Sequence, residues 1–412
     1  MLKRLHLLLA LFILTVNAAM AQITTSGISG KITSDGENVI GATVTATHQP
    51  SGTVYRAVTN IDGRYTIQGM RPGGPYKVDI SYIGYKDKVI KNLNLSLGET
   101  ENISCSLQED AHQLQEVVVS GKAGLAASRT GAATSMTAEQ INNMPSITHG
   151  IADVARLNPQ LTVTNSGNMS FAGVNNRYNN FMIDGAANND VFGLASSGNN
   201  GGQAGAQPVS METIEQIQVS VAPFDVRQSG FTGGAINAIT KSGTNQFHGS
   251  AYYYGYNQDL IGTKYPYLDG TGYAPKYQKQ TQYNMGVTLG GPIIKNKLFF
   301  FANYERTNKE YPNLYGVDSG NSKVNTEQAK DILSMLQEMA EKQGVNFNDY
   351  YSNQDIYTKS DKAGLKLDWN INEFNKFAIR WSLVKAEQLS GGGSASSLNS
   401  YGYSYPFKSN TN

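Results

Sequence analysis

The segment Leu114-Gln-Glu-Val-Val-Val-Ser-Gly121 separates two parts of the chain that follow different patterns. Its three consecutive β-branched valines favour an extended backbone. No turn residues beside them offer a hairpin partner within the segment. An extended segment without a partner of its own can pair with another protein or lie against a neighbouring sheet of the same chain. These eight residues by themselves leave both interpretations open.

The composition of the chain limits its possible fold classes and functions. Its 412 residues suffice for two or three domains, and only 16% are charged, whereas 43 are glycine and 24 are tyrosine. That mixture suits β-structure with long polar loops. A formal net charge of +1 gives no electrostatic footprint for nucleic acid, so we expect no nucleic-acid partner. Cys105 is the single cysteine, and the five histidines fall in separate segments. We therefore predict no metal site, no cofactor and no catalytic residues, and hence no enzyme.

The N-terminus has the pattern of an export signal. Lys3 and Arg4 form a positive region, Leu5 to Val16 an apolar core, and Ala19-Met20-Ala21 a cleavage site with small residues. We assign residues 1–21 as a signal peptide. No later window reaches about 18 consecutive apolar residues, so a membrane location would require β-strands.

Residues 22–110 predict a small β-sandwich. Short alternating runs are separated by turn residues such as Asp35-Gly36 and Pro72-Gly73-Gly74. About seven short strands at this spacing are typical of a sandwich. The expected strands are Ile28 to Thr33, Ala42 to His48, Val54 to Thr59, Arg64 to Gln68, Tyr76 to Tyr82, Lys88 to Leu95 and Asn102 to Leu107.

Residues 111–133 hold the valine segment and a linker rich in small residues, and residues 134–245 predict a compact α+β domain. Thr137-Ala-Glu-Gln140 forms a capping box that opens a short helix. A second helical pattern ends at Asn158-Pro159. Strand-like runs follow at Phe181 to Ile183, Ile217 to Val221 and Gly233 to Lys241, joined by loops rich in glycine and asparagine.

Residues 246–412 predict the first strands of a transmembrane antiparallel β-barrel. Apolar residues alternate with polar ones, and alternation with a period of two indicates one lipid-facing and one polar face. The apolar series are Tyr283, Met285, Val287 and Leu289; Ala363, Leu365, Leu367, Trp369 and Ile371; and Phe377, Ile379, Trp381 and Leu383. Phe247 to Tyr256 and Leu298 to Glu305 add two aromatic-rich strands.

Connections between these strands alternate in length. They are long at Asn257 to Gln280 and Thr307 to Lys359, and short at Lys295-Asn296 and Asn372 to Asn375. Transmembrane barrels have short periplasmic turns and long external loops, so the first strand should run outward from the periplasm. About five strands cannot close a barrel around a folded plug, which needs about 22. We therefore expect this chain to be the N-terminal part of a longer protein.

The order of several motifs resembles the TonB-dependent outer-membrane receptors. The motifs are the helix ending in Asn158-Pro159, Gly173 to Arg177, Ile183-Asp184-Gly185, Ile214 to Ile217 and Gly233-Gly-Ala-Ile-Asn237. Residues 22–110 resemble the carboxypeptidase regulatory-like domain, a transthyretin-like sandwich, through Thr59 to Ile67 and Val78 to Tyr85. The segment Ala222 to Asn237 is most similar to the Oar-like branch, which carries that domain before its plug.

This resemblance implies a receptor in the outer membrane that imports a substrate with energy from TonB and its inner-membrane complex. It identifies Leu114, Gln115, Glu116, Val117, Val118 and Val119 as a TonB box, located with the sandwich in the periplasm. TonB would add a strand to this backbone. Outer-membrane lipid is the second expected partner, and a lid lipoprotein is left open. An Oar-like adhesion or export function is the alternative.

Polar loops of the second module supply candidate ligand contacts. Adaptable hydrogen-bonding groups are expected at a plug apex, and a solvated loop without ligand is an equal alternative. The candidate substrate-binding residues are Asn188, Asn189, Asp190, Asn199 and Asn200. Asp184 could also contact substrate, but an Asp-Gly turn is the preferred interpretation. The sequence does not name the substrate: glycan, peptide, siderophore and cobalamin all stay open.

Overall fold

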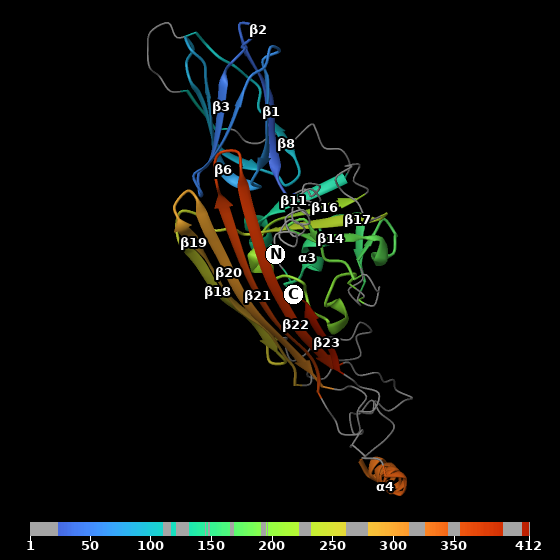
Figure 1. Cartoon of the computed structure of the whole chain (residues 1–412). Helices are drawn as coiled ribbons and strands as arrows, with labels where there is room; N and C mark the ends of the chain where they lie inside the picture. The colour runs from blue at the N-terminus through green and yellow to red at the C-terminus, as the bar shows by residue number, and fades with distance from the viewer. Residues whose placement is uncertain are drawn as a thin grey trace, which may run out of the picture.

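A computed structural model describes most of the chain. The described residues are 24–109, 117–120, 132–164, 169–190, 195–221, 232–260, 279–312, 326–344, 355–389 and 406–411, apart from 145, 147, 148 and 196. The assigned signal peptide and most of the linker lie outside these ranges. The described chain is mainly β and forms a sandwich, a plug domain and a curved sheet, in that order (Figure 1).

The sandwich consists of two sheets packed face to face. One sheet has the order β2-β1-β5, with β8 and β9 pairing in parallel with β1; the other has the order β10-β7-β6-β3-β4. The alternation of apolar residues predicts these strands closely, because every second side chain enters the core. The strands are β1 Ser26–Ser34, β2 Glu37–Asn38, β3 Thr43–His48, β4 Thr53–Val58, β5 Arg64–Met70, β6 Gly73–Ser81, β7 Lys88–Leu95, β8 Thr100–Asn102 and β9 Cys105–Ser106. Ile28, Val44 and Tyr76 are fully buried between the sheets.

The valine segment is partly described. Val117–Ser120 form β10, which lies at the edge of the second sandwich sheet and pairs in parallel with β7. The register joins Val117 to Lys88 and Ser120 to Lys91. Leu114, Gln115 and Glu116 lie outside the described residues. Val117–Ser120 therefore lie against a neighbouring sheet of the same chain, which is one of the two interpretations that the sequence left open.

The plug domain has a five-stranded sheet with the order β11-β16-β17-β14-β15. Its strands are β11 Ala132–Thr137, β14 Asn180–Ile183, β15 Ala186–Ala187, β16 Ile214–Val221 and β17 Gly234–Thr240, beside the small hairpin β12 Leu161–Val163 and β13 Met169–Phe171. Helix α2 spans Ala138–Asn143 and α3 spans Ile151–Ala155. The predicted capping box is present, because Thr137 and Gln140 bond each other's backbone N–H groups. Ile217 and Val154 lie in the core of this domain.

Six antiparallel strands form the barrel sheet. They are β18 His248–Asn257, β19 Thr281–Ile294, β20 Leu298–Tyr311, β21 Ile356–Asn370, β22 Lys376–Leu389 and β23 Pro406–Thr411, paired in chain order. The sequence predicted about five barrel strands, and β23 is an additional one. The predicted faces are confirmed: Val287, Ile379 and Trp381 are about half exposed on the outer face, whereas Glu305 and Lys362 are buried on the inner face.

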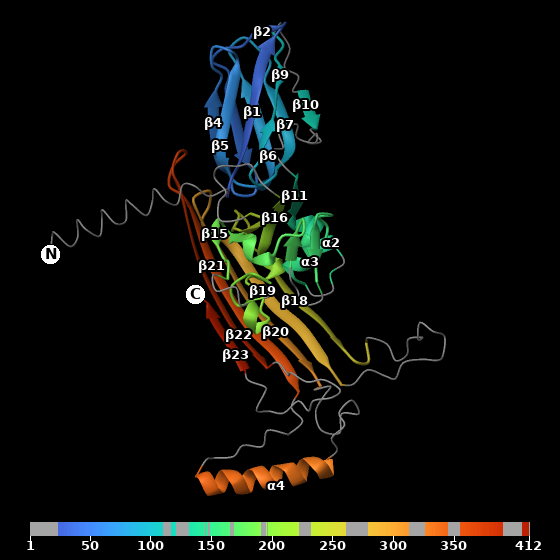
Figure 2. The ribbon, with the colours of Figure 1, turned by 90° about the vertical axis from the view of Figure 1, so that its right-hand side faces the viewer.

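The three parts are stacked along one axis. The plug lies against the concave face of the barrel sheet, and the sandwich lies at the end of the sheet that carries the short turns (Figures 1 and 2). Helix α4, Thr326–Gln343, lies beyond the opposite end, within a long connection (Figure 2). Among the described residues, no helix is both long and apolar enough to cross a membrane.

Candidate functional site

The junction between plug and barrel is built on Asp184. It follows β14 in a tight turn, in which Asp184 and Gly185 both have left-handed backbone angles, with φ of 49° and 81°. The preferred interpretation of an Asp-Gly turn is therefore confirmed. The Asp184 carboxylate also accepts hydrogen bonds from the backbone N–H of Thr240 at 2.9 Å and from its hydroxyl at 2.6 Å. The turn thereby fixes one carboxylate at the surface of the plug that faces the barrel.

Two barrel cations neutralise this carboxylate. Lys366 Nζ lies 3.4 Å from Asp184 Oδ1, and Arg380 Nε lies 3.4 Å from Oδ2. Burial alone would raise the pKa of Asp184, but Lys366, Arg380 and the Thr240 bonds outweigh it and hold that pKa below its usual value. Lys366 also donates a hydrogen bond to the backbone carbonyl of Thr240 at 3.0 Å. These contacts tie plug strands β14 and β17 to barrel strands β21 and β22.

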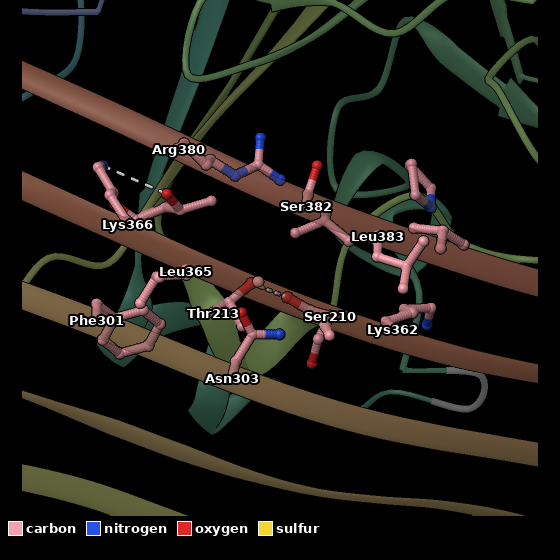
Figure 3. Close-up of a pocket in the computed structure, with 16 residues that line it drawn as sticks. Ser210, Thr213, Phe301, Asn303, Lys362, Leu365, Lys366, Arg380, Ser382 and Leu383 are labelled. Carbon is pink, nitrogen blue, oxygen red and sulfur yellow. Dashed lines mark hydrogen bonds between the residues drawn. The ribbon is translucent and has the colours of Figure 1, made fainter. Parts of the chain in front are cut away.

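A second charged cluster lies further along the same junction. Glu305 of β20 and Lys362 of β21 are register partners and form an ion pair of 2.5 Å. The other carboxylate oxygen of Glu305 accepts hydrogen bonds from Ser210 of the plug at 2.6 Å and from Tyr252 of β18 at 2.7 Å. Figure 3 shows the narrow pocket between the two clusters, with Ser210 on the plug side and Lys362, Lys366 and Arg380 on the barrel side.

The five candidate substrate-binding residues lie together in one polar loop. Asn189 and Asn199 form an isolated β-bridge, and the backbone N–H of Asn200 donates to the carbonyl of Asn188 at 3.1 Å. The side chains largely order the loop itself: Oδ1 of Asn189 accepts a hydrogen bond from the backbone N–H of Phe181 at 2.7 Å. Asp190 likewise accepts from the N–H of Ala195. Ligand binding by this loop stays a prediction.

One feature of that loop does point to an open space. Asn199 lines a cavity of about 350 Å³ between plug and barrel, which also reaches His149, Glu305 and Lys362. The cavity wall is mainly polar side chains and glycine, as the sequence predicts for a site of adaptable hydrogen bonding. Among the described side chains, no group of three or more histidine, cysteine or acidic residues is arranged to hold a metal ion.

The sandwich contacts both of the other parts. Leu97, in the turn after β7, donates its N–H to Gln216 Oε1 at 2.7 Å and accepts from Gln218 Nε2 at 3.0 Å. Both glutamines lie on plug strand β16, and both side chains are buried. The backbone N–H and carbonyl of one sandwich residue, Leu97, are therefore both bonded to the plug.

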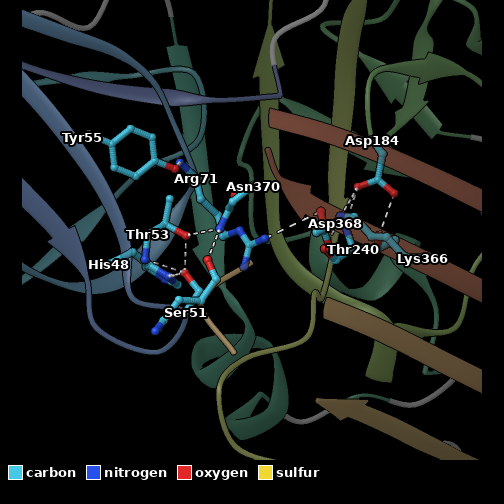
Figure 4. Close-up of polar contacts among 11 residues, drawn as sticks. His48, Ser51, Thr53, Tyr55, Arg71, Asp184, Thr240, Lys366, Asp368 and Asn370 are labelled. Carbon is cyan, nitrogen blue, oxygen red and sulfur yellow. Dashed lines mark hydrogen bonds and ion pairs between the residues drawn. The ribbon is translucent and has the colours of Figure 1, made fainter. Parts of the chain in front are cut away.

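Barrel residues receive the sandwich on the other side. Asn370 donates to Thr53 Oγ1 at 2.9 Å, and Arg71 lies 3.6 Å from Asp368 (Figure 4). Lys376 lies 3.6 Å from the ring centroid of Tyr55. A cavity of about 380 Å³ lies between the three parts and is lined by residues of each. Asp184 also lines this cavity, so the sandwich and the ionic contact between plug and barrel border the same cavity.

Buried His48 lies behind this contact. Its Nδ1 is 2.7 Å from Ser51 Oγ, which is 2.7 Å from Thr53 Oγ1, so a chain of hydrogen bonds reaches Asn370 of the barrel. Burial, together with the nearby Arg71, lowers the pKa of His48 to about 3. His48 is therefore neutral at physiological pH.

Sequence reasoning did not find the polar contacts of either junction. Lys362, Lys366 and Asp368 do belong to the polar series of a barrel strand, which marks them as inward-facing. Their partners in the plug and sandwich could not be read from the sequence, because a period of two fixes the face of a strand and not what lies opposite it.

Three family descriptions match consecutive parts of the chain. "Carboxypeptidase regulatory-like domain" matches residues 27–108, "TonB-dependent Receptor Plug Domain" residues 126–236, and "Outer membrane beta barrel domain" residues 239–316. With the sandwich, plug and barrel sheet in this order, the chain belongs to the TonB-dependent outer-membrane receptors. Members of this family are receptors and transporters, not enzymes.

Among curated proteins, the chain is similar to the TonB-dependent transporter Oar of Myxococcus xanthus, with 29% identity over 63% of this chain and 24% of Oar. It is also similar to a probable TonB-dependent siderophore receptor, PirA, of Acinetobacter baumannii, with 25% identity over 42% of this chain and 22% of PirA. The chain thus spans about a quarter of the length of these relatives. The outer-membrane transporter YddB of Escherichia coli superposes with a TM-score of 0.43 at 15% identity, over 64% of this chain and 34% of YddB.

Proposed function

We propose that the chain belongs to a receptor that binds its substrate outside the cell and imports it into the periplasm with energy coupled through TonB. The observation that carries this is the position of Val117–Ser120. Residues 121–131 join this segment directly to β11, and β11 is the edge strand of the plug sheet. Within the plug, a pull on the segment therefore reaches first a strand with one neighbour in the described sheet, β16.

An edge strand can be removed from a sheet with the smallest loss of hydrogen bonds, because it pairs with only one other strand. Removing β11 breaks its register with β16 from Ala132–Val221 to Thr137–Gln216, while β16, β17 and β14 stay paired. Force applied at the valine segment would thus loosen the plug from one side. TonB, energised by its inner-membrane complex, supplies this force by adding a strand to Leu114–Val119, chiefly through main-chain hydrogen bonds.

Orientation follows from the two ends of the barrel sheet. The sandwich lies beside the short turns, since the N–H of Asn245 donates to the carbonyl of Pro50 and Arg56 pairs with Glu373 of the β21–β22 turn. Short turns of outer-membrane barrels face the periplasm. We place the sandwich and the valine segment there, and the long connections with α4 outside. The half-exposed outer face, with Val287, Leu289 and Trp381, meets lipid.

Substrate would reach the plug from the outside. Asn188, Asn189, Asp190, Asn199 and Asn200 form the polar loop that we propose as its contact, with the 350 Å³ cavity beside Asn199. Polar, largely uncharged groups favour a ligand rich in hydrogen-bonding groups.

The test is binding of the purified C-terminal domain of TonB to the full-length receptor. Val118→Pro removes a backbone N–H and should weaken binding at least about tenfold, the effect of roughly 1.4 kcal/mol. Val118→Thr keeps both the N–H and the β-branched shape, so it should bind like the parent. Equal binding of the proline variant would exclude coupling through this segment. Uptake assays with the same pair then separate import from an Oar-like adhesion or export function, which would not need the coupling.

A further inference from the structure

The sandwich covers the short-turn end of the plug and barrel. It contacts plug strand β16 through Leu97, barrel strand β21 through Thr53 and Arg71, and the turn after β21 through Arg56. The 380 Å³ cavity lies beneath it.

The attachment is one that can be undone. Its contacts are mostly single hydrogen bonds and ion pairs, and the Arg56–Glu373 pair is about half exposed. The 3.6 Å approach of Arg71 to Asp368 is long. The two hydrogen bonds to Leu97 are the best protected of these contacts. Gln216 and Gln218 are only 2% and 7% exposed, so their bonds are shielded from water.

The segment on which TonB would pull belongs to the sandwich sheet. β10 pairs with β7 over four residues, and Leu97 lies two residues beyond the end of β7. Force applied to Val117–Ser120 is therefore shared between two routes. One runs through residues 121–131 to β11, and the other runs through β7 to the Leu97 contact. Both routes end on β16, where Gln216 and Gln218 are the register partners of Thr137 and Ser135.

We propose that the sandwich is a lid on the short-turn end of the receptor, held shut by Gln216 and Gln218, and that the pull of TonB lifts this lid before it loosens the plug; the second half rests on the coupling proposed above. While the lid is shut, the two glutamines hold β16 against both the sandwich and β11. Once Leu97 is released, β16 stays paired with β17 and β11 can be drawn away.

Cross-linking measures the closed lid without TonB. Arg56→Cys and Glu373→Cys in a Cys105→Ser background of the full-length receptor place two accessible thiols across the contact between the sandwich and the β21–β22 turn, where a short bismaleimide can join them. The parent should cross-link readily. Adding Gln216→Leu and Gln218→Leu should slow cross-linking about tenfold or more, as expected from the loss of two buried hydrogen bonds. Ser220→Ala, on the same strand but bonded within the plug, is the matched control. An unchanged rate in the double-leucine variant would overturn the role of the glutamines.

Pulling measures the order of events. The receptor is held in a lipid nanodisc by its barrel, and the C-terminal domain of TonB is drawn away from the valine segment. Two successive ruptures are expected, lid first and plug second, and the cross-linked receptor should lose the first. The same ruptures with and without the cross-link would overturn the lid. If the TonB domain fails to bind the uncross-linked receptor, the coupling fails instead, and the cross-linking rates still report the lid.

Discussion

The plug and the sandwich are fastened to the same barrel sheet by different chemistry. At the plug junction, the Asp184 carboxylate meets two barrel cations, and Ser210 donates to Glu305, whose ion pair with Lys362 within the barrel sheet is more than nine-tenths buried. At the sandwich junction, Thr53 accepts a neutral hydrogen bond from Asn370, Arg71 lies 3.6 Å from Asp368, and the Arg56–Glu373 pair is half in solvent.

This difference sets how each part can come loose. A buried charge that is separated from its counter-charge is not solvated by water, which costs several kcal/mol. The plug junction therefore resists partial opening. Neutral groups and exposed ions exchange one partner for water at small net cost. Under the proposed pull by TonB, the junction that is easier to open would be the one that meets the force first.

Loss of the Asp184 charge should have the largest effect. Asp184→Ala leaves Lys366 and Arg380 without their shared counter-charge, and breaking a buried pair in this way costs about 3–5 kcal/mol. Plug peptides should exchange hydrogen faster by mass spectrometry, whereas sandwich-core peptides should not. Asp184→Asn keeps the shape and can keep the Thr240 contacts, so the difference between the two variants separates charge from hydrogen bonding. Equal protection in wild type and Asp184→Ala would remove the contrast between the junctions.

A double-mutant cycle at Glu305 and Lys362 tests the buried barrel ion pair to which Ser210 of the plug is bonded. Each single change, Glu305→Gln or Lys362→Met, leaves one unpaired buried ion and should cost about 3 kcal/mol or more. The double variant should lose clearly less than the sum, since no ion is left unpaired. Thermal unfolding of the plug in the four proteins gives the coupling free energy. Additive effects would mean that solvent already reaches this pair.

Acid should weaken the sandwich through His48. Its folded pKa of about 3 lies below the unfolded value of 6.5, so the unfolded state takes up the proton first as the pH falls. The stability due to neutral His48 is complete above pH 6.5 and decreases toward pH 3. At pH 5.5 the loss is about 1.4 kcal/mol. Hydrogen exchange of sandwich peptides at pH 7.5 and 5.5, corrected for intrinsic rates, measures it, and His48→Gln should reduce the difference.

The smallest effect is expected at Arg56. Its ion pair with Glu373 is short, at 2.7 Å, but both side chains are more than half exposed. Arg56→Ala should change the stability by about 0–1 kcal/mol, less in high salt. A loss comparable to that at Asp184 would show that the sandwich junction is as strongly held as the plug junction.

The fold could be predicted from the sequence because it is a fold of strands with two distinct faces. Alternation identified the sandwich strands and five barrel strands, and Thr137-Ala-Glu-Gln140 marked the start of α2. The sixth barrel strand was not predicted, because Pro406–Thr411 is short and contains a single large apolar residue, Phe407. The long connections between barrel strands were recognisable from their length alone.

The site was harder to predict, since it depends on contacts between distant segments. The Asp184 turn follows from two adjacent residues, but Lys366 lies 182 positions away. Asn188 to Asn200 were found as a polar loop, although several of its amides order the loop itself. The sequence did not mark Gln216 and Gln218 as contact residues. Glutamines are common on strands, and their role follows only from the Leu97 backbone that they bond in the folded protein.

Barrel strand β21 has a consequence for how such receptors can be recombined. Lys366 contacts the plug, and Asp368 and Asn370 contact the sandwich, all from the inner face of one strand. The three modules are therefore not interchangeable units at this strand. A chimaera that receives a foreign regulatory-like domain should need matching residues at 368 and 370, and one that receives a foreign plug should need a match at 366. Grafts designed at module boundaries alone would leave both contacts mismatched.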